Sequence, residues 1–265
     1  MIGYNGLMSM HIRQIYMSGE RLTRRRYVNG QMHHPMAFQV QVEAHPISRQ
    51  DRIEQDEAII GMPIPEIYFG DNKLVIYNDT MSLCFCALDA LKTVSHEVQF
   101  KVQNARPSKY EEAKPYDWTY AMRYKGTLCG HVRIEETSMP QFLPMDLLKK
   151  KCEIHQFESV DLFEDELGDN GTSLVNVKYR AMSFGWFCLL RQFIRIDHVH
   201  YIQHEVRYSH LHNESIIKRE VMSMSCPYDT IGHNVDDIRE YLTPLISPES
   251  YNTIVTQEII HMVNK

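Results

Sequence analysis

The sequence predicts an α+β protein built mainly on antiparallel β-sheets, sandwich-like, with peripheral helices. Several segments alternate between apolar and polar residues, which is the pattern of a strand with one buried face. Short turns separate these segments, and such turns join antiparallel strands, whereas parallel strands need helical crossovers. Helix signals occur at only a few places. We expect residues 1–36 to form a loosely ordered N-terminal arm and residues 37–265 to form a single domain.

The composition narrows the classes of function. Of the 265 residues, 43% are hydrophobic and 23% are charged, so the chain can build a core. The 28 basic and 34 acidic residues give a net charge of −6, which disfavours a nucleic-acid binder because such proteins need a positive surface. No apolar run approaches the roughly 18 residues of a membrane span. We therefore expect no nucleic-acid and no membrane partner. The six scattered cysteines indicate reduced thiols in a cytoplasmic protein.

Strand signals begin in the first half of the chain. Two β-prone runs, residues 74–77 and 81–87, flank the turn residues 78–80 and predict a hairpin. Large side chains alternate along residues 118–124, so we expect a strand that buries one face there.

Strand signals continue in the second half. They cover residues 175–181, 186–196, 199–208 and 216–222. Asp197 and His198 have the length of a two-residue hairpin turn, in which the backbone needs a positive φ. Histidine is among the residues that tolerate this conformation.

Three helices are expected. Pro144 suits the first turn of a helix over residues 145–157, and Asn234 can cap a helix over residues 235–242. Ser247 as a cap and Pro248 as the first residue predict a final helix that runs to Met262.

Histidines and acidic residues support one enzymatic hypothesis. His200 and His204 lie on the strand expected over residues 199–208, and residues 158–169 contain six acidic and no basic side chains. Imidazoles with carboxylates can bind a divalent cation, which gives the hypothesis of a metal-dependent enzyme that uses His200, His204 and the acidic residues of 164–169. A solvated acidic face, or an anchor for a basic partner, explains the acidic segment better. Nucleophile-elbow and glycine-rich phosphate-loop motifs are absent.

One face of the strand over residues 199–208 favours protein interaction. Alternation places Tyr201, Gln203, Glu205 and Arg207 on the same face. Tyrosine and arginine are enriched in protein interfaces. A cross-strand charge pair on a solvated sheet face is the alternative.

Five sequence runs, in one order, resemble the TIPRL family, the Tip-forty-one-like regulators of the TOR signalling pathway. The runs are residues 65–72 (PEIYFGDN), 114–120 (KPYDWTY), 124–128 (YKGTL), 162–167 (LFEDEL) and 195–197 (RID). The resemblance extends over residues 63–225. It implies a β-rich fold with peripheral helices and a groove for a phosphatase.

The resemblance also implies a function. It points to a regulator, not an enzyme, that binds the catalytic subunits of type 2A, type 4 and type 6 protein phosphatases in TOR signalling, with no catalytic residue, metal or cofactor of its own. The phosphatase-associated protein alpha-four is a further implied partner, and the implied location is the cytoplasm, with the nucleus in addition. A scaffold that has lost phosphatase binding is an alternative within the same family.

The resemblance places four partner-binding positions on this chain. They are Asp89, Leu143, Gln203 and Glu205. Asp89 matches the family's residue type, whereas Gln203 stands where the family has methionine and Glu205 where it has aspartate. Retention of the charge at position 205 implies that Glu205→Lys weakens phosphatase binding and leaves the fold intact.

Overall fold

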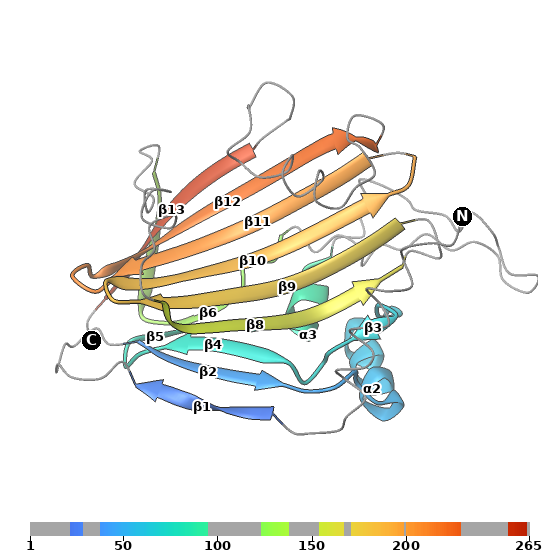
Figure 1. Ribbon diagram of the computed structural model, residues 1–265, viewed down its shortest axis with the longest axis horizontal. Helices are drawn as coiled ribbons and strands as arrows, with labels where there is room; N and C mark the ends of the chain where they lie inside the picture. The colour runs from blue at the N-terminus through green and yellow to red at the C-terminus, as the bar shows by residue number, and fades with distance from the viewer. Residues whose placement is uncertain are drawn as a thin grey trace, which may run out of the picture.

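The computed structural model describes residues 22–28, 38–94, 123–137, 154–166, 171–198, 200–228 and 254–263. They form two antiparallel β-sheets (Figure 1). The smaller sheet has the order β1 (Leu22–Val28), β2 (Gln39–Ala44), β4 (Lys73–Tyr77), β5 (Met81–Cys86), β6 (Thr127–Gly130). The larger sheet has the order β3 (Ile67–Tyr68), β8 (Ile154–Asp165), β9 (Gly171–Met182), β10 (Gly185–Ile196), β11 (His200–Leu211), β12 (Ile216–Pro227), β13 (Ile254–Met262), β7 (Val132–Glu136).

The helices in the described part of the chain are short. They are α2 (Gln50–Ile60), before β3, and α3 (Ala87–Leu91), directly after β5. Neither is long and apolar enough to cross a membrane. Strands dominate and helices are peripheral, which confirms the predicted fold class.

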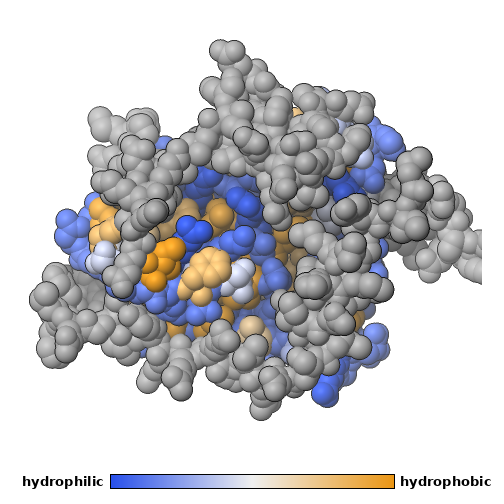
Figure 2. All heavy atoms as spheres, viewed as in Figure 1, coloured by the Kyte–Doolittle hydropathy of each residue, from blue (hydrophilic) through white to orange (hydrophobic). Residues whose placement is uncertain are grey.

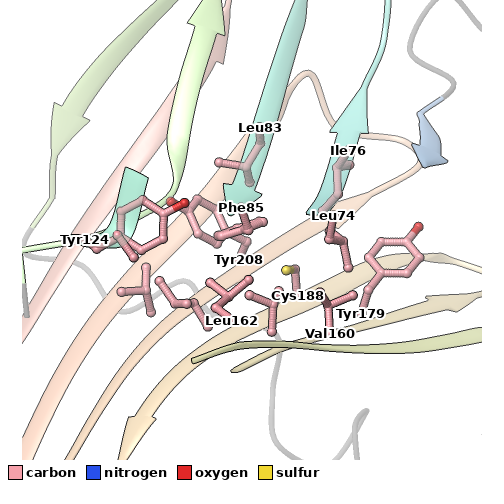
Figure 3. Close-up of a cluster of buried hydrophobic side chains, with 14 of the residues drawn as sticks. Leu74, Ile76, Leu83, Phe85, Tyr124, Val160, Leu162, Tyr179, Cys188 and Tyr208 are labelled. Carbon is pink, nitrogen blue, oxygen red and sulfur yellow. The ribbon is translucent and has the colours of Figure 1, made fainter. Parts of the chain in front are cut away.

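The core lies between the two sheets (Figure 3). Alternate side chains of β4 and β5, such as Leu74 and Phe85, pack against alternate side chains of β8 to β11, such as Leu162, Cys188 and Tyr208. Side chains alternate between the faces of a strand, so each of these strands contributes an inner face to the core and an outer face on the other side. The rings of Phe85 and Tyr208 meet edge to face with centroids 5.9 Å apart.

The predicted hairpins are confirmed. Asn78 closes the β4–β5 turn, since its side-chain oxygen accepts hydrogen bonds from the backbone N–H groups of Thr80 and Met81, both at 2.9 Å. The turn between β10 and β11 is one residue longer than the two residues expected, because Ile196 pairs with His200. His198 has a φ of 62°, which is the predicted left-handed conformation.

Two predicted helices are wrong where the structure describes them. Residues 254–262, expected to end the last helix, form β13, which pairs with β12 and β7. Glu258, Ile260 and Met262 are buried in alternation, as a strand requires. The end of the helix expected over residues 145–157 is the start of β8.

The remaining expectations concern the N-terminal arm and segments outside the described residues. Residues 22–28, within the expected loosely ordered arm, form β1 and pair with β2. The helix expected over residues 235–242 and the site residue Leu143 lie outside the described residues. Most of the strand expected over residues 118–124 also lies outside them, and its described end, residues 123 and 124, is not in a strand.

Candidate protein-interaction site

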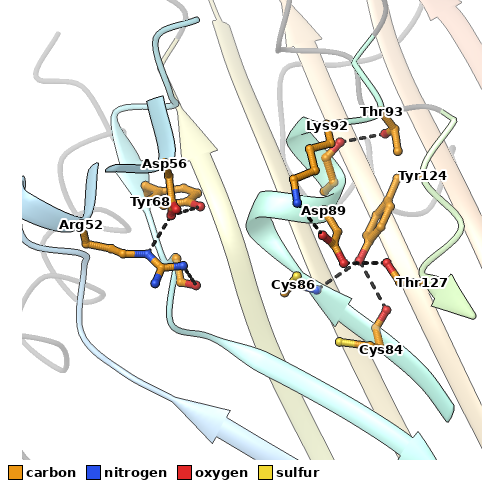
Figure 4. Close-up of polar contacts among 12 residues, drawn as sticks. Arg52, Asp56, Tyr68, Cys84, Cys86, Asp89, Lys92, Thr93, Tyr124 and Thr127 are labelled. Atoms are coloured by element: carbon orange, nitrogen blue, oxygen red, sulfur yellow. Dashed lines mark hydrogen bonds and ion pairs between the residues drawn. The ribbon is translucent and has the colours of Figure 1, made fainter. Parts of the chain in front are cut away.

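Asp89 lies on α3, at the end of β5. Its carboxylate accepts a hydrogen bond of 2.7 Å from the Thr127 hydroxyl and contacts the Lys92 ammonium at 3.4 Å (Figure 4). Burial favours the neutral carboxyl, but the hydrogen bonds from Thr127 and Lys92 outweigh it and lower the pKa of Asp89. The side chain keeps 29% of its surface exposed. Asp89 is therefore an ionised group at the surface, held in one orientation by its neighbours.

A cavity of about 330 Å³ opens beside Asp89. It is lined by Asp89, Lys92, Thr93, Arg123, Tyr124, Lys125, Gly126 and Thr127. Three lining side chains are basic and one is acidic, so the excess charge is positive. The volume is near the lower limit for ligand pockets, which suits a single side chain or chain end of a partner.

Residues 123–127 are fixed to both sheets. The Tyr124 hydroxyl accepts a hydrogen bond from the Cys86 backbone N–H at 3.1 Å, on the smaller sheet. On the larger sheet, the Tyr208 hydroxyl donates to the Lys125 carbonyl, and the Lys125 ammonium lies 3.2 Å from Glu258. Gly126 has a φ of 80°, which glycine adopts without strain. The wall of the cavity is thus held by side chains of two sheets.

Gln203 and Glu205 lie on the outer face of the larger sheet. They alternate on β11 with Val206 and Tyr208, which face the core. Tyr201 and Arg207 share the face of Gln203 and Glu205, as predicted. In the view of Figure 2, hydrophilic and hydrophobic side chains are intermixed over the described residues.

Glu205 is the centre of an ion cluster. Its Oε1 atom accepts hydrogen bonds from Arg191 Nε at 2.8 Å and Gln203 Nε2 at 2.7 Å, and its Oε2 atom accepts one from Arg207 Nε at 2.8 Å. Arg191 is the register partner of Glu205 on β10. The cross-strand charge pair of the alternative interpretation is therefore present, but its carboxylate is fully buried and does not lie on a solvated face. Arg191 could not be assigned to the site from the sequence, because its role depends on the β10–β11 register.

The burial of Glu205 corrects the expectation that Glu205→Lys leaves the fold intact. Glu205 has no exposed side-chain surface, whereas Arg191 is 32% exposed and Arg207 16%. A partner that reaches this face meets the two guanidinium groups, and the carboxylate holds them in place. Glu205→Lys would put a third cation between them, so this substitution disturbs the fold and does not test binding alone.

The three predicted site residues that the structure describes do not form one cluster. Asp89 lies on α3, directly after β5 of the smaller sheet, whereas Gln203 and Glu205 point from the outer face of the larger sheet. They define two separate candidate surfaces.

The described residues contain no ligand cluster of the kind that the metal-dependent enzyme hypothesis requires. Among the described residues, no three His, Cys, Asp or Glu side chains are placed to bind a metal ion together. His204 is buried on the inner face of β11, and burial lowers its pKa to about 4. Asp165 of the acidic segment accepts a hydrogen bond from the Glu66 backbone N–H at 2.8 Å, which ties β8 to the chain before β3.

The described residues thus form two packed antiparallel sheets with a charged cavity beside α3 and an ion cluster on the outer face of the larger sheet. A family model, described as the TIP41-like family, matches residues 67–232. The chain belongs to this family. It is 35% identical over 183 residues to the human TIP41-like protein, an alignment that covers 64% of this chain and 67% of the relative.

Two yeast relatives carry a functional name. The type 2A phosphatase activator TIP41 of Saccharomyces cerevisiae is 30% identical over 210 residues, with 69% of this chain and 59% of the relative covered. The type 2A phosphatase activator tip41 of Schizosaccharomyces pombe is 28% identical over 205 residues, with 72% and 81% covered.

Proposed function

We propose that this chain is a non-enzymatic regulator of type 2A-family protein phosphatases that binds their catalytic subunits. The observation that carries the proposal is family membership over residues 67–232, together with the names of the yeast relatives. The matched region contains the α3 cavity and the whole of β11. Both candidate surfaces therefore belong to the part of the chain that the family shares.

The α3 cavity supplies an oriented charge for binding. Ionised Asp89 stands at the rim among Lys92, Arg123 and Lys125, so the cavity can pair with a partner group of either sign. Charges at the edge of an interface contribute mainly to orientation and association rate.

The outer face of β11 supplies a second contact. The side chains of Arg191 and Arg207 are 32% and 16% exposed, and Glu205, which has no exposed surface, fixes their direction. A guanidinium group that is already oriented loses less conformational entropy on binding than a free one, and arginine is frequent among interface residues that dominate affinity.

The test is direct binding. The full chain is immobilised for biolayer interferometry, and the catalytic subunits of type 2A, type 4 and type 6 phosphatases are passed over it, with a phosphatase of an unrelated fold as the control. We expect saturable binding to the type 2A subunit and none to the control. Absence of binding to all three subunits by a folded chain would refute the proposal.

The finer assignments are part of the proposal. They are binding to the type 4 and type 6 subunits, association with alpha-four, action in TOR signalling, and location in the cytoplasm and nucleus. Competition between alpha-four and this chain for the immobilised type 2A subunit tests whether the two bind together or in exchange.

A further inference from the structure

Strand β8 forms an edge of the larger sheet that is only partly closed by its neighbour. The two residues of β3 pair with Phe163 and Glu164, near the arrowhead of β8 (Figure 1). Just before them, the Asn72 side chain donates a hydrogen bond of 2.8 Å to the Asp161 carbonyl. Within the described part of the chain, no strand pairs with residues 154–160 on the side away from β9. The first half of β8 is therefore an open sheet edge.

The open part of β8 is a regular strand. The pairing of β8 with β9 shifts register near each end of β8. Between the two shifts, residues 156–161 pair one to one with residues 176–181 of β9. Strands of about six residues are typical of sheets, so this stretch has the length to pair with one further strand. The backbone N–H and C=O groups along an open edge are the groups that such a strand binds.

Large apolar side chains are exposed on the same stretch. Ile154 is 48% exposed and Phe157 is 50% exposed. The guanidinium group of Arg180, the register partner of Phe157 on β9, lies 5.7 Å from the centre of the Phe157 ring. The ring is thus positioned from the β9 side. An open edge that carries exposed apolar side chains is a template for pairing with another chain.

The charge of β8 decides which kind of chain fits. The strand has no lysine or arginine, and its acidic residues are Glu158, Asp161, Glu164 and Asp165. Burial raises the pKa of Glu164, and the nearby carboxylates of Asp161 and Glu166 raise it further. The neighbouring cations Lys178 and Arg180 belong to β9. A second copy of β8 at this edge would set acid against acid, which is unfavourable across strands, so a basic strand is the complementary one.

We propose that the open edge of β8 is a docking site for an extended basic segment of a partner protein, which adds to the larger sheet as an antiparallel strand beside residues 156–161. The antiparallel direction follows that of every paired strand in this sheet. Residues opposite one another share a face. Basic side chains of the segment therefore lie opposite Glu158 and Asp161, and an apolar side chain lies opposite Phe157.

This docking site is independent of the proposed phosphatase function. Arg191 and Arg207 lie on β10 and β11, which are two and three strands from β8 in the sheet order. The cavity beside α3 is lined by residues 89–93 and 123–127 and by none of β8. Binding at the β8 edge and binding of the type 2A catalytic subunit are therefore measured separately.

Fluorescence anisotropy with the full chain tests the site. The labelled probe is the synthetic peptide Lys-Val-Thr-Lys-Ile-Thr, whose lysines lie opposite Asp161 and Glu158, and whose isoleucine lies opposite Phe157, in the antiparallel register. One control peptide has glutamate in place of both lysines. The other has proline at its second and third positions, so that one lost N–H faces β8 in either pairing pattern. We expect saturable binding of the lysine peptide alone, with a dissociation constant below about 1 mM.

Hydrogen exchange locates the bound peptide. Amides of residues 154–161 that face the open edge should exchange quickly in the free chain and about tenfold more slowly with the lysine peptide bound. The exchange of β7, at the opposite edge of the same sheet, should not change. Protection of other segments without protection of residues 154–161 would overturn the proposal.

Matched variants at the two edges of the sheet separate the contacts. Phe157→Ala removes the apolar contact and Glu158→Gln removes one charge, and each should weaken peptide binding about threefold or more. Ile134→Ala and Glu135→Gln are the controls on β7, because Ile134 is 47% exposed and Glu135 is 58% exposed. Both controls should bind the peptide as the wild type does.

The contrary outcomes are distinct. Equal binding of the proline peptide would reduce the interaction to charge attraction and overturn strand addition, as would equal binding by Phe157→Ala and Glu158→Gln. No saturable binding of the lysine peptide to the folded chain would overturn the docking site. A dimer in sedimentation that Phe157→Ala dissociates would make a second copy the occupant and overturn the basic partner. Loss of phosphatase binding by the wild type would refute only the proposed function.

Discussion

Arg191 and Glu205 face each other across β10 and β11, with the Arg191 Nη2 atom 2.6 Å from the Glu205 Oε1 atom. Arg207, two residues along β11, binds the other carboxylate oxygen. The register of one strand pair thus places a fully buried acidic side chain between two partly exposed arginines. Under the proposed function, stability and partner binding both depend on this cluster.

The first prediction concerns Glu205→Gln. The substitution removes the carboxylate that pairs with both Arg191 and Arg207, and leaves Arg207 with Glu220 at 3.7 Å. Loss of one member of a buried ion pair costs about 3–5 kcal/mol. We expect the free energy of unfolding in urea to fall by this order. Glu135→Gln is the control, because Glu135 is 58% exposed and its pairs with Arg133 and His261 are solvated. Its expected cost is below about 1 kcal/mol, and equal costs would contradict the account of Glu205.

The second prediction concerns the contact between α2 and β3. Asp56 is 2% exposed, and its Oδ2 atom accepts hydrogen bonds of 2.8 Å from the Tyr68 hydroxyl and from Arg52 Nε (Figure 4). Tyr68→Phe removes one donor from a buried carboxylate and should lower the free energy of unfolding by about 1–3 kcal/mol. Tyr77→Phe removes a half-buried hydroxyl that binds the Gln39 side chain, and it should cost less. A larger effect at Tyr77 than at Tyr68 would exclude this role of Asp56.

The third prediction concerns acid. Burial is the main cause that lowers the pKa of His204 from 6.5 to about 4; Lys125 lowers it further and Glu205 opposes both. Between these two values the unfolded chain binds a proton that the folded chain does not. Stability is therefore complete above about pH 6.5 and is lost as the pH falls toward 4, by about 3 kcal/mol in total.

Comparison of variants isolates this effect. The difference in unfolding free energy between the wild type and His204→Met should shrink as the pH falls from about 6.5 to about 4. Replacement of the exposed His131 by glutamine should give no such change. A difference that stays constant with pH would show that His204 does not couple folding to protonation.

The fourth prediction concerns the β10–β11 turn. His198 has a φ of 62°, which costs a residue other than glycine about 1–3 kcal/mol and is worst for β-branched side chains. His198→Val should lower the melting temperature clearly, and His198→Gly should not. The reverse order would contradict the left-handed conformation.

Alternation along the chain made most of the fold predictable. The β4–β5 hairpin and the strands β9 to β12 were found because burial on one face leaves a period of two in the sequence. The error at β13 has a physical cause. Ser247 and Pro248 give a helix start signal, but pairing with β12 and β7 decides the conformation of residues 254–262, and such long-range pairing leaves no local mark.

The candidate site was predictable only in part. Alternation placed Gln203 and Glu205 on one face, yet the burial of Glu205 depends on Arg191 from a neighbouring strand. The cavity at Asp89 forms because Thr127 approaches from 38 residues along the chain. Neither the burial of Glu205 nor the cavity at Asp89 can be predicted from residue spacing within a single segment.

Interferometry with site variants tests the central claim most directly. The type 2A catalytic subunit is titrated against the wild-type chain, Asp89→Arg, Arg191→Ala and the control Glu135→Arg, each checked for native circular dichroism. We predict saturable wild-type binding that is weakened about tenfold or more by Asp89→Arg and Arg191→Ala and unchanged by the control, a difference of about 1.4 kcal/mol or more. Equal binding by all four folded chains would contradict the two surfaces, and no binding by the wild type would contradict the function.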